Sequence, residues 1–120
     1  MTQCLLINED QSERKALSGY FGDLGFDLSE AANADAGLSQ CRASAPDVVV
    51  VTEQIGTRSP DYVRRLQRIG NGKPPVVIIY SSNPDTEAIG RMIMDGAAEV
   101  IVKPFSKDLL SFKLKQVGLI

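Results

Sequence analysis

Short, almost continuous apolar runs alternate along this chain with segments in which apolar residues recur every three or four positions. The runs richest in valine and isoleucine are residues 4–7, 47–51, 76–80 and 100–102, and a weaker run covers 26–31. Strands that are apolar on both faces are typical of a parallel sheet covered by helices on both sides. Because crossovers between parallel strands are right-handed, the alternation predicts five βα units in a three-layer α/β sandwich.

The segments between these runs carry helix start and stop signals. Gly25 directly follows the first helical pattern, at a position where a glycine commonly ends a helix. Asn33 or Asp35 has a side chain suited to cap the second helix. We expect the third helix to begin at Pro60, the fourth after residues 83–85 and the fifth after Ser106.

Size and charge narrow the class of protein. The chain has 120 residues, and without repeats or a linker we expect a single domain over residues 1–120, with no effector domain. The formal net charge of -2 is too near neutral to favour direct DNA binding. No apolar run approaches the ~20 residues that cross a bilayer, and the first residues do not resemble a signal peptide. We therefore expect a cytoplasmic protein with no membrane partner.

Several kinds of catalytic site are excluded by the residues themselves. Histidine, the commonest general base, is absent. Cys4 and Cys41 do not make a disulfide framework, and we expect both to be reduced. The sequence also has no glycine-rich phosphate loop. An enzyme is thus the least expected class.

Polar residues with a common chemistry follow the predicted strands. In a sheet of this type, function gathers where the strands end, near the point at which the strand order reverses. Adjacent carboxylates and a lysine at that edge suit a hard divalent cation and a phosphoryl group. The residues at these strand ends are Glu9, Asp10, Thr52, Glu53, Tyr80, Ser81 and Lys103.

Four stretches of sequence resemble the landmarks of response-regulator receiver domains. They are LLINEDQ, PDVVVV, PPVVIIYSS and GAAEVIVKPF, in family order and at family spacing, and the resemblance covers essentially the whole chain. It implies a flavodoxin-like (CheY-like) five-stranded parallel sheet of order 2-1-3-4-5 with five helices. It also implies a protein partner, which would be a histidine kinase, a regulator, an adaptor target or a second copy of the chain.

Three residues match the functional positions of the family. Glu9 and Asp10 correspond to the acidic pair that holds magnesium, and Lys103 to the lysine that contacts the phosphoryl group. With two carboxylates in place of three, we expect weak magnesium binding and no required cofactor. The alternative is a leftover acidic pocket that Lys103 neutralises.

Three other positions depart from the family. Thr52 stands where the resemblance places the phosphate-accepting aspartate, Tyr80 where it places a switch threonine or serine, and Val100 where it places a switch aromatic residue. A threonine hydroxyl is hardly ionised near neutral pH and cannot form an acyl phosphate. Strand alternation turns Glu53 to the opposite side, unless a one-residue bulge brings it into the pocket. Tyr80 either fills the phosphoryl space or points outward.

Two surfaces are candidates for binding. Arg64, Arg65 and Arg68 form a basic patch that suits a cyclic dinucleotide or another phosphorylated ligand, or is simply a solvated helix face. Family alignment places Met94 outward beside Val100 and Val102, on the fourth-helix, fifth-strand, fifth-helix face through which receivers commonly dimerise or bind partners. The alternative for these three residues is scattered apolar surface.

These observations favour a pseudo-receiver, a phosphorylation-independent signalling module that acts by protein–protein interaction. A ligand sensor that binds a nucleotide or a metal is one alternative. The other is an atypical phosphoacceptor that uses Glu53 in a two-component phosphorelay.

Overall fold

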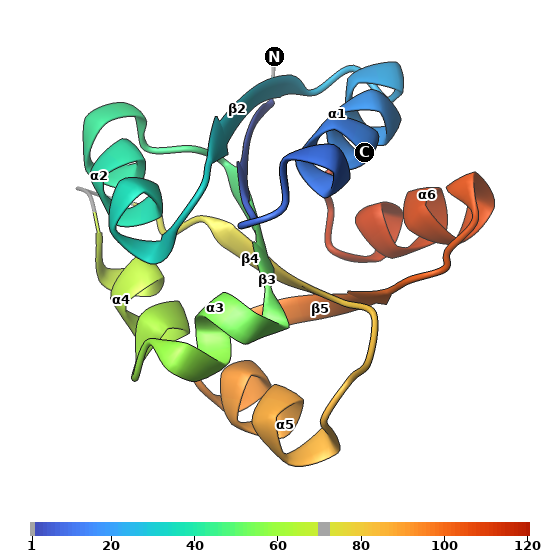
Figure 1. Ribbon diagram of the computed structural model, residues 1–120. Helices are drawn as coiled ribbons and strands as arrows, with labels where there is room; N and C mark the ends of the chain where they lie inside the picture. Colours follow the sequence, from blue (N-terminus) through green and yellow to red (C-terminus); the bar gives the residue numbers. More distant parts are fainter. Residues whose placement is uncertain (1, 70–72) are drawn as a thin grey trace.

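The computed structural model describes residues 2–69 and 73–120, which contain one five-stranded parallel sheet (Figure 1). Neighbouring strands are parallel throughout, in the order β2-β1-β3-β4-β5. The predicted fold class and the strand order implied by the resemblance are confirmed. The strands are β1 (Gln3–Ile7), β2 (Asp27–Ala31), β3 (Val48–Thr52), β4 (Val76–Ser81) and β5 (Ala97–Val102).

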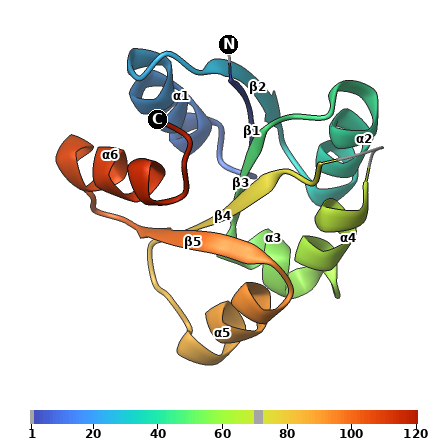
Figure 2. The ribbon, with the colours of Figure 1, turned by 180° about the vertical axis from the view of Figure 1, so that it is seen from behind.

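Helices cover both faces of the sheet, as the two opposite views show (Figures 1 and 2). One face packs against α1 and α6, and the other against α2, α3, α4 and α5. In the part of the chain that is described, no helix is both long and apolar enough to cross a membrane. The helices are α1 (Gln11–Asp23), α2 (Ala34–Ser44), α3 (Glu53–Arg58), α4 (Tyr62–Arg68), α5 (Thr86–Met94) and α6 (Lys107–Gln116).

The connection from β3 to β4 differs from the sequence prediction, because it holds two helices and raises the number within the described residues from five to six. The Thr52 side chain caps α3, so a helix begins as soon as β3 ends. Pro60 does not open a helix. It lies in the turn before Asp61, whose left-handed backbone (φ 60°) precedes the start of α4 at Tyr62.

The other predicted helix ends are confirmed. Asn33, and not Asp35, accepts the capping hydrogen bond at the start of α2. Asp85 caps α5, and Ser106 caps α6. Gly25 has a φ of 92°, the left-handed conformation that glycine adopts without a steric penalty.

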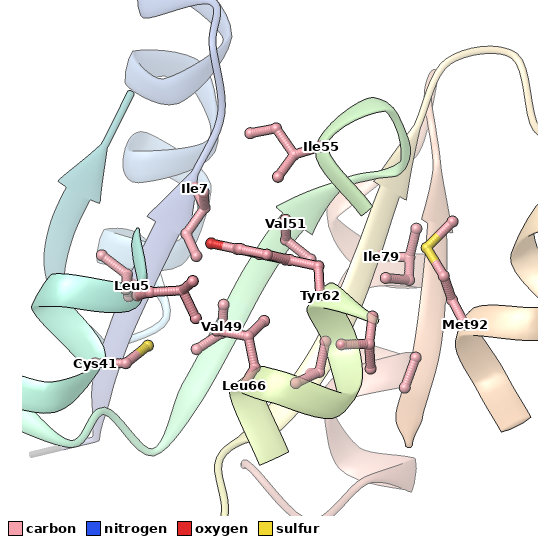
Figure 3. Close-up of a cluster of buried hydrophobic side chains, with 14 of the residues drawn as sticks. Leu5, Ile7, Cys41, Val49, Val51, Ile55, Tyr62, Leu66, Ile79 and Met92 are labelled. Atoms are coloured by element: carbon pink, nitrogen blue, oxygen red, sulfur yellow. The ribbon is translucent and has the colours of Figure 1, made fainter. Parts of the chain in front are cut away.

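The valines of β3 explain why the sheet needs helices on both sides. Val49 and Val51 point into one buried cluster, shown in Figure 3, whereas Val48 and Val50 point into the other. All four are at most 2% exposed, and each fully buried valine contributes on the order of 1.5–3 kcal/mol to folding. Tyr62 is buried in the same cluster as Val49 and Val51. Its hydroxyl donates a hydrogen bond to the backbone oxygen of Ala34, so the buried hydroxyl is not left without a partner.

Candidate functional site

A polar cleft of about 260 Å³ lies where β1, β3 and β4 end. Every strand-end residue singled out in the sequence lines this cleft except Lys103. The topology thus brings together side chains from three separate connections, as expected for a sheet whose strand order reverses here. The lining residues are Asn8, Glu9, Asp10, Glu13, Thr52, Glu53, Gln54, Tyr80, Ser81, Ser82 and Asn83.

Thr52 is the last residue of β3 and is 9% exposed. Its Oγ1 accepts a hydrogen bond from the backbone N of Ile55 at 3.3 Å, which caps α3. The Thr52 hydroxyl therefore acts as the N-cap of α3. Position 52 carries no carboxylate, and a threonine hydroxyl is un-ionised near neutral pH.

Glu53 lies in the cleft, contrary to the orientation that strand alternation predicts. β3 ends at Thr52, so Glu53 is the first residue of a helix and no bulge is needed to turn its side chain inward. Its Oε1 accepts a hydrogen bond from Ser81 Oγ at 2.7 Å, and its Oε2 accepts one from the backbone N of Asp85 at 3.2 Å. Glu53 thereby joins the ends of β3 and β4.

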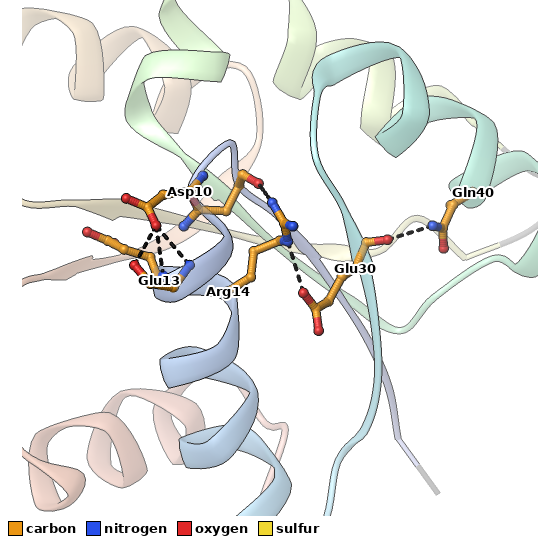
Figure 4. Close-up of polar contacts among 7 residues, drawn as sticks. Asp10, Glu13, Arg14, Glu30 and Gln40 are labelled. Carbon is orange, nitrogen blue, oxygen red and sulfur yellow. Dashed lines mark hydrogen bonds and ion pairs between the residues drawn. The ribbon is translucent and has the colours of Figure 1, made fainter.

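The two acidic residues after β1 have separate partners. Asp10 is the N-cap of α1, and its Oδ1 accepts hydrogen bonds from the backbone N of Ser12 at 2.9 Å and of Glu13 at 3.1 Å (Figure 4). Hydrogen bonds from Ser12 and Glu13 lower the pKa of Asp10, so it stays ionised. Glu9 forms an ion pair with Arg58 at 2.5 Å. Because Arg58 lies 49 residues away, the sequence gives no signal of this pair.

Arg14 fixes the loop that carries the acidic pair. Its side chain is 14% exposed, its Nη1 donates to the backbone oxygen of Asn8 at 2.6 Å, and its Nε contacts Glu30 at 2.9 Å. Figure 4 shows Gln40 on the far side, donating to the backbone oxygen of Glu30. The loop after β1 is therefore fastened to β2 and α2 through contacts that the sequence analysis did not identify.

Lys103 lies beside the cleft and pairs with Glu13 at 3.2 Å. The prediction that it neutralises both Glu9 and Asp10 is wrong for Glu9, whose partner is Arg58. Its charge lowers the pKa of Asp10, as the smallest of the contributions. Half of the Lys103 side chain is exposed, so the pair with Glu13 contributes little to stability.

Tyr80 points inward and is 6% exposed. Its ring packs edge-on against Phe105, with 6.2 Å between ring centroids, and it also lines the cleft. Of the two orientations left open by the sequence, the outward one is excluded. Burial raises the pKa of Tyr80, and the neighbouring Glu13 carboxylate raises it further, so the phenol is neutral.

The two carboxylates that the sequence assigns to magnesium already have protein partners. Glu9 is already paired with Arg58, and Asp10 Oδ1 is committed to the start of α1. Asn8 presents a buried amide Nδ2 without a hydrogen-bond partner, and this atom is a donor that cannot ligate a cation. Over residues 2–69 and 73–120, no group of three or more histidine, cysteine or acidic side chains is arranged to hold a metal ion.

Comparison with known proteins gives the family. The model of the response regulator receiver domain matches residues 4–115. The chain belongs to the response regulator receiver family. It is a signalling module of two-component systems rather than an enzyme, and receivers typically partner with a histidine kinase.

Two curated relatives resemble the receiver in sequence. The transcriptional regulatory protein AfsQ1 of Streptomyces coelicolor is 26% identical over 118 residues, which are 98% of this chain and 51% of AfsQ1. The probable C4-dicarboxylate response regulator DctR of Bacillus subtilis is 30% identical over 87 residues, which are 72% of this chain and 38% of DctR. The chain therefore spans about half the length of AfsQ1 and less of DctR.

Solved structures share the fold of this receiver. A response regulator from Thermotoga maritima superposes with a TM-score of 0.83 at 23% identity, covering 98% of this chain and 97% of its own. The chemotaxis response regulator CheY4 of Vibrio cholerae gives 0.83 at 20% identity and 98% of each chain. At this level of identity the likeness concerns the fold alone.

The predicted interaction face of the receiver is only partly exposed. Met94, at the end of α5, is 88% exposed, and its neighbour Ile93 is 50% exposed. Val102 is 38% exposed, whereas Val100 is half-buried and packs against the core. An exposed apolar surface remains at Ile93 and Met94, with Val102 on the edge strand.

The predicted basic patch is partly occupied by internal contacts. Arg64 binds Asp95 at 2.7 Å and lies 3.6 Å from Asp61. The hydrogen bond that Arg64 donates to the Asp95 carboxylate raises the pKa of Arg64. Arg65 and Arg68 are exposed on the same short helix, α4. Arg64 therefore has a structural role, and the patch that remains for a ligand is smaller than the sequence predicts.

Proposed function

We propose that this receiver signals without being phosphorylated, by binding another protein through a surface that it presents permanently. Thr52 is the observation that carries the proposal. It stands at the end of β3, where the family resemblance places the acceptor aspartate, and its hydroxyl is engaged in capping α3. Acyl phosphate formation needs a carboxylate nucleophile, which a threonine side chain does not supply.

The surroundings of Thr52 support the same proposal. The Lys103 ammonium pairs with Glu13, and Lys103 is not among the residues that line the cleft around Thr52. The ring of Tyr80 is buried at the end of β4, where the resemblance places a small hydroxyl residue. Both features oppose a transferred phosphoryl group.

The exposed apolar residues around Met94 support a protein partner. A methionine adapts its shape to a docking surface, and Ile93 lies beside it on the exposed end of α5. The partner would be a histidine kinase, another regulator, an adaptor or a second copy of the chain. A charge at Met94 would then weaken binding by roughly 1–3 kcal/mol, the scale of an interface anchor, without affecting the fold.

Intact mass spectrometry after incubation with acetyl phosphate and Mg²⁺ tests the proposal. We expect no gain of a phosphoryl group. Thr52→Asp is the matched control, because it places a carboxylate nucleophile at the end of β3, and its phosphorylation would show that the conditions support the reaction. A stoichiometric gain on the unaltered chain would overturn the proposal.

One observation favours a second candidate. The Glu53 carboxylate lines the cleft and directly follows Thr52 in the sequence. An incoming phosphoryl group would therefore meet this carboxylate beside the usual acceptor position. In this candidate the chain is an atypical phosphoacceptor. Mass spectrometry would support this candidate if the unaltered chain gained a phosphoryl group and Glu53→Gln did not.

A further inference from the structure

The Glu53 carboxylate contacts two parts of the connection between β4 and α5. Ser81 Oγ, at the end of β4, donates to Glu53 Oε1 at 2.7 Å and also accepts from the backbone N of Asn83 at 3.2 Å. The backbone N of Asp85 lies 3.2 Å from Oε2 and 3.4 Å from Oε1 of Glu53. One charged side chain on α3 therefore organises residues 81–85.

The second of these contacts reaches the start of α5. Asp85 is the N-cap of α5, and its Oδ1 accepts from the backbone N of Glu87 at 3.0 Å and of Ala88 at 3.4 Å. Glu53 holds the backbone of this cap residue. Hydrogen bonds to a carboxylate are stronger than those between neutral groups, so this contact favours one starting point for the helix.

Two further contacts join α5 to the same side of the molecule. Gly56 on α3 lies so close to α5 that an added Cβ would come within 2.6 Å of Met92 Sδ. At the other end of α5, Arg64 binds the C-cap residue Asp95 at 2.7 Å. The contacts at Gly56 and Arg64 lie at the C-terminal half of α5. At its beginning, Ala88 is buried in the core and Glu53 adds a hydrogen bond to the cap residue.

We propose that Glu53 is an internal latch, a side chain at the start of α3 whose two carboxylate oxygens hold the β4–α5 connection and the first turn of α5 in one position. The inference rests on the proposed function, because a latch built into the cleft would let the receiver keep one conformation without a transferred phosphoryl group. The exposed residues Ile93 and Met94 end this same helix. Opening the latch therefore loosens the element that presents them.

Amide hydrogen exchange on the whole chain, without any phosphoryl donor, tests the latch. In Glu53→Ala both acceptors are lost, and we expect residues 83–89 to exchange roughly tenfold faster or more, while β1 and α1 keep their rates. Glu53→Gln keeps the shape but offers one acceptor oxygen, so its effect should be intermediate and in the same residues. If Glu53→Ala does not fold, Glu53→Gln carries the test.

Two controls separate the latch from a general loss of stability. Gln54→Ala removes the next side chain, which is exposed and also lines the cleft, and it should leave residues 83–89 unchanged. In the Glu53→Ala background, the added effect of Ser81→Ala should be confined to Asn83, because the hydrogen bond to Glu53 is already lost and only the acceptor of the Asn83 amide is newly removed. Unchanged exchange in a folded Glu53→Ala variant, or an equal effect of Gln54→Ala, would overturn the inference. Neither result depends on phosphorylation, so failure of the latch is distinguishable from failure of the proposed function.

Discussion

At the end of β3, the side chains of Thr52 and Glu53 do not follow the alternation of a strand that continues past Thr52. Thr52 is buried and caps a helix, whereas Glu53 enters the cleft. The sequence identified both positions but not this outcome, because the side-chain direction of Glu53 depends on where the strand stops. Strand alternation applies only as far as Thr52, and helix geometry decides the next residue.

The first prediction at this scale concerns the Thr52 cap. Thr52→Ala should lower the free energy of unfolding by about 1 kcal/mol, since it removes the side-chain acceptor for the Ile55 amide. Thr52→Ser should retain most of the stability. Urea denaturation measures both, with Thr57→Ala on the exposed surface of the same helix as control. Equal losses in Thr52→Ala and Thr57→Ala would show that the cap is unimportant.

A second prediction concerns the acidic pair. Magnesium should bind the unaltered chain only in the millimolar range or more weakly, because Glu9 is paired with Arg58 and Asp10 Oδ1 caps α1. Thr52→Asp should strengthen binding by adding a carboxylate at the end of β3. Isothermal titration calorimetry compares the two proteins. Micromolar binding by the unaltered chain would mean that the acidic pair already forms a magnesium site.

The buried thiols supply a third prediction. Burial raises the pKa of Cys4 to about 12 and that of Cys41 to about 11, from an ordinary value of 9.0. Below pH 9.0 both thiols are protonated in the folded and the unfolded chain, so their contribution to stability is fully present. Above it the unfolded chain releases protons first, and stability should fall as pH rises towards the two folded values.

Urea midpoints measured across this alkaline range check the prediction on the thiols. The thiols should also react with an aromatic disulfide reagent only as fast as the chain unfolds. Prompt reaction of either thiol in the native protein at about pH 8, close to the pKa of about 8.5 of a free cysteine, would show that it is accessible.

At the scale of elements, local patterns located every strand and most helix ends. Continuous valine runs and the capping residues Asn33, Asp85 and Ser106 are local signals, and local signals suffice for elements of this kind. The division of the β3–β4 connection into α3 and α4 was missed. It depends on the cap at Thr52 and on the left-handed backbone of Asp61, and neither is evident from periodicity.

Long-range ion pairs were equally out of reach of the sequence. Glu9 with Arg58, and Lys103 with Glu13, join residues whose proximity follows from the sheet order and not from spacing. The sequence could place charged residues at the strand ends, but it could not assign partners among them.

The edge strand β5 offers a prediction about an element. Lys113 on α6 pairs with Glu99 at 3.0 Å and donates to the backbone oxygen of Val100, while Glu99 accepts from the Val100 backbone N at 2.8 Å. These contacts satisfy both backbone groups of Val100 at the edge of the sheet, where β5 has one strand neighbour. Both charged side chains are less than a quarter exposed.

Lys113→Met should therefore cost about 1–2 kcal/mol, between the values for exposed and for fully buried pairs. Lys115→Met, on the exposed side of α6, is the control and should be nearly neutral. Thermal or urea unfolding measures both variants. An effect of Lys113→Met no larger than that of its control would mean that the pair with Glu99 does not support β5.

At the scale of the whole molecule, the cleft and the exposed end of α5 are connected by one short chain of contacts. The cleft lies where the strand order reverses between β1 and β3, and Glu53 links it to the start of α5. α5 then ends at the exposed Met94. A ligand or modification shifts a population only through different affinities for two states. On our proposal, a latch that is part of the chain keeps the receiver in one of them.

On our proposal, this receiver holds one conformation whether or not a phosphoryl donor is present. Amide NMR spectra of the isotope-labelled chain, recorded with Mg²⁺ alone and with Mg²⁺ plus acetyl phosphate, test it most directly. We predict that the two spectra superimpose over α5 and β5. Coordinated shifts of these elements that appear with the donor and fade as it is hydrolysed would contradict the claim.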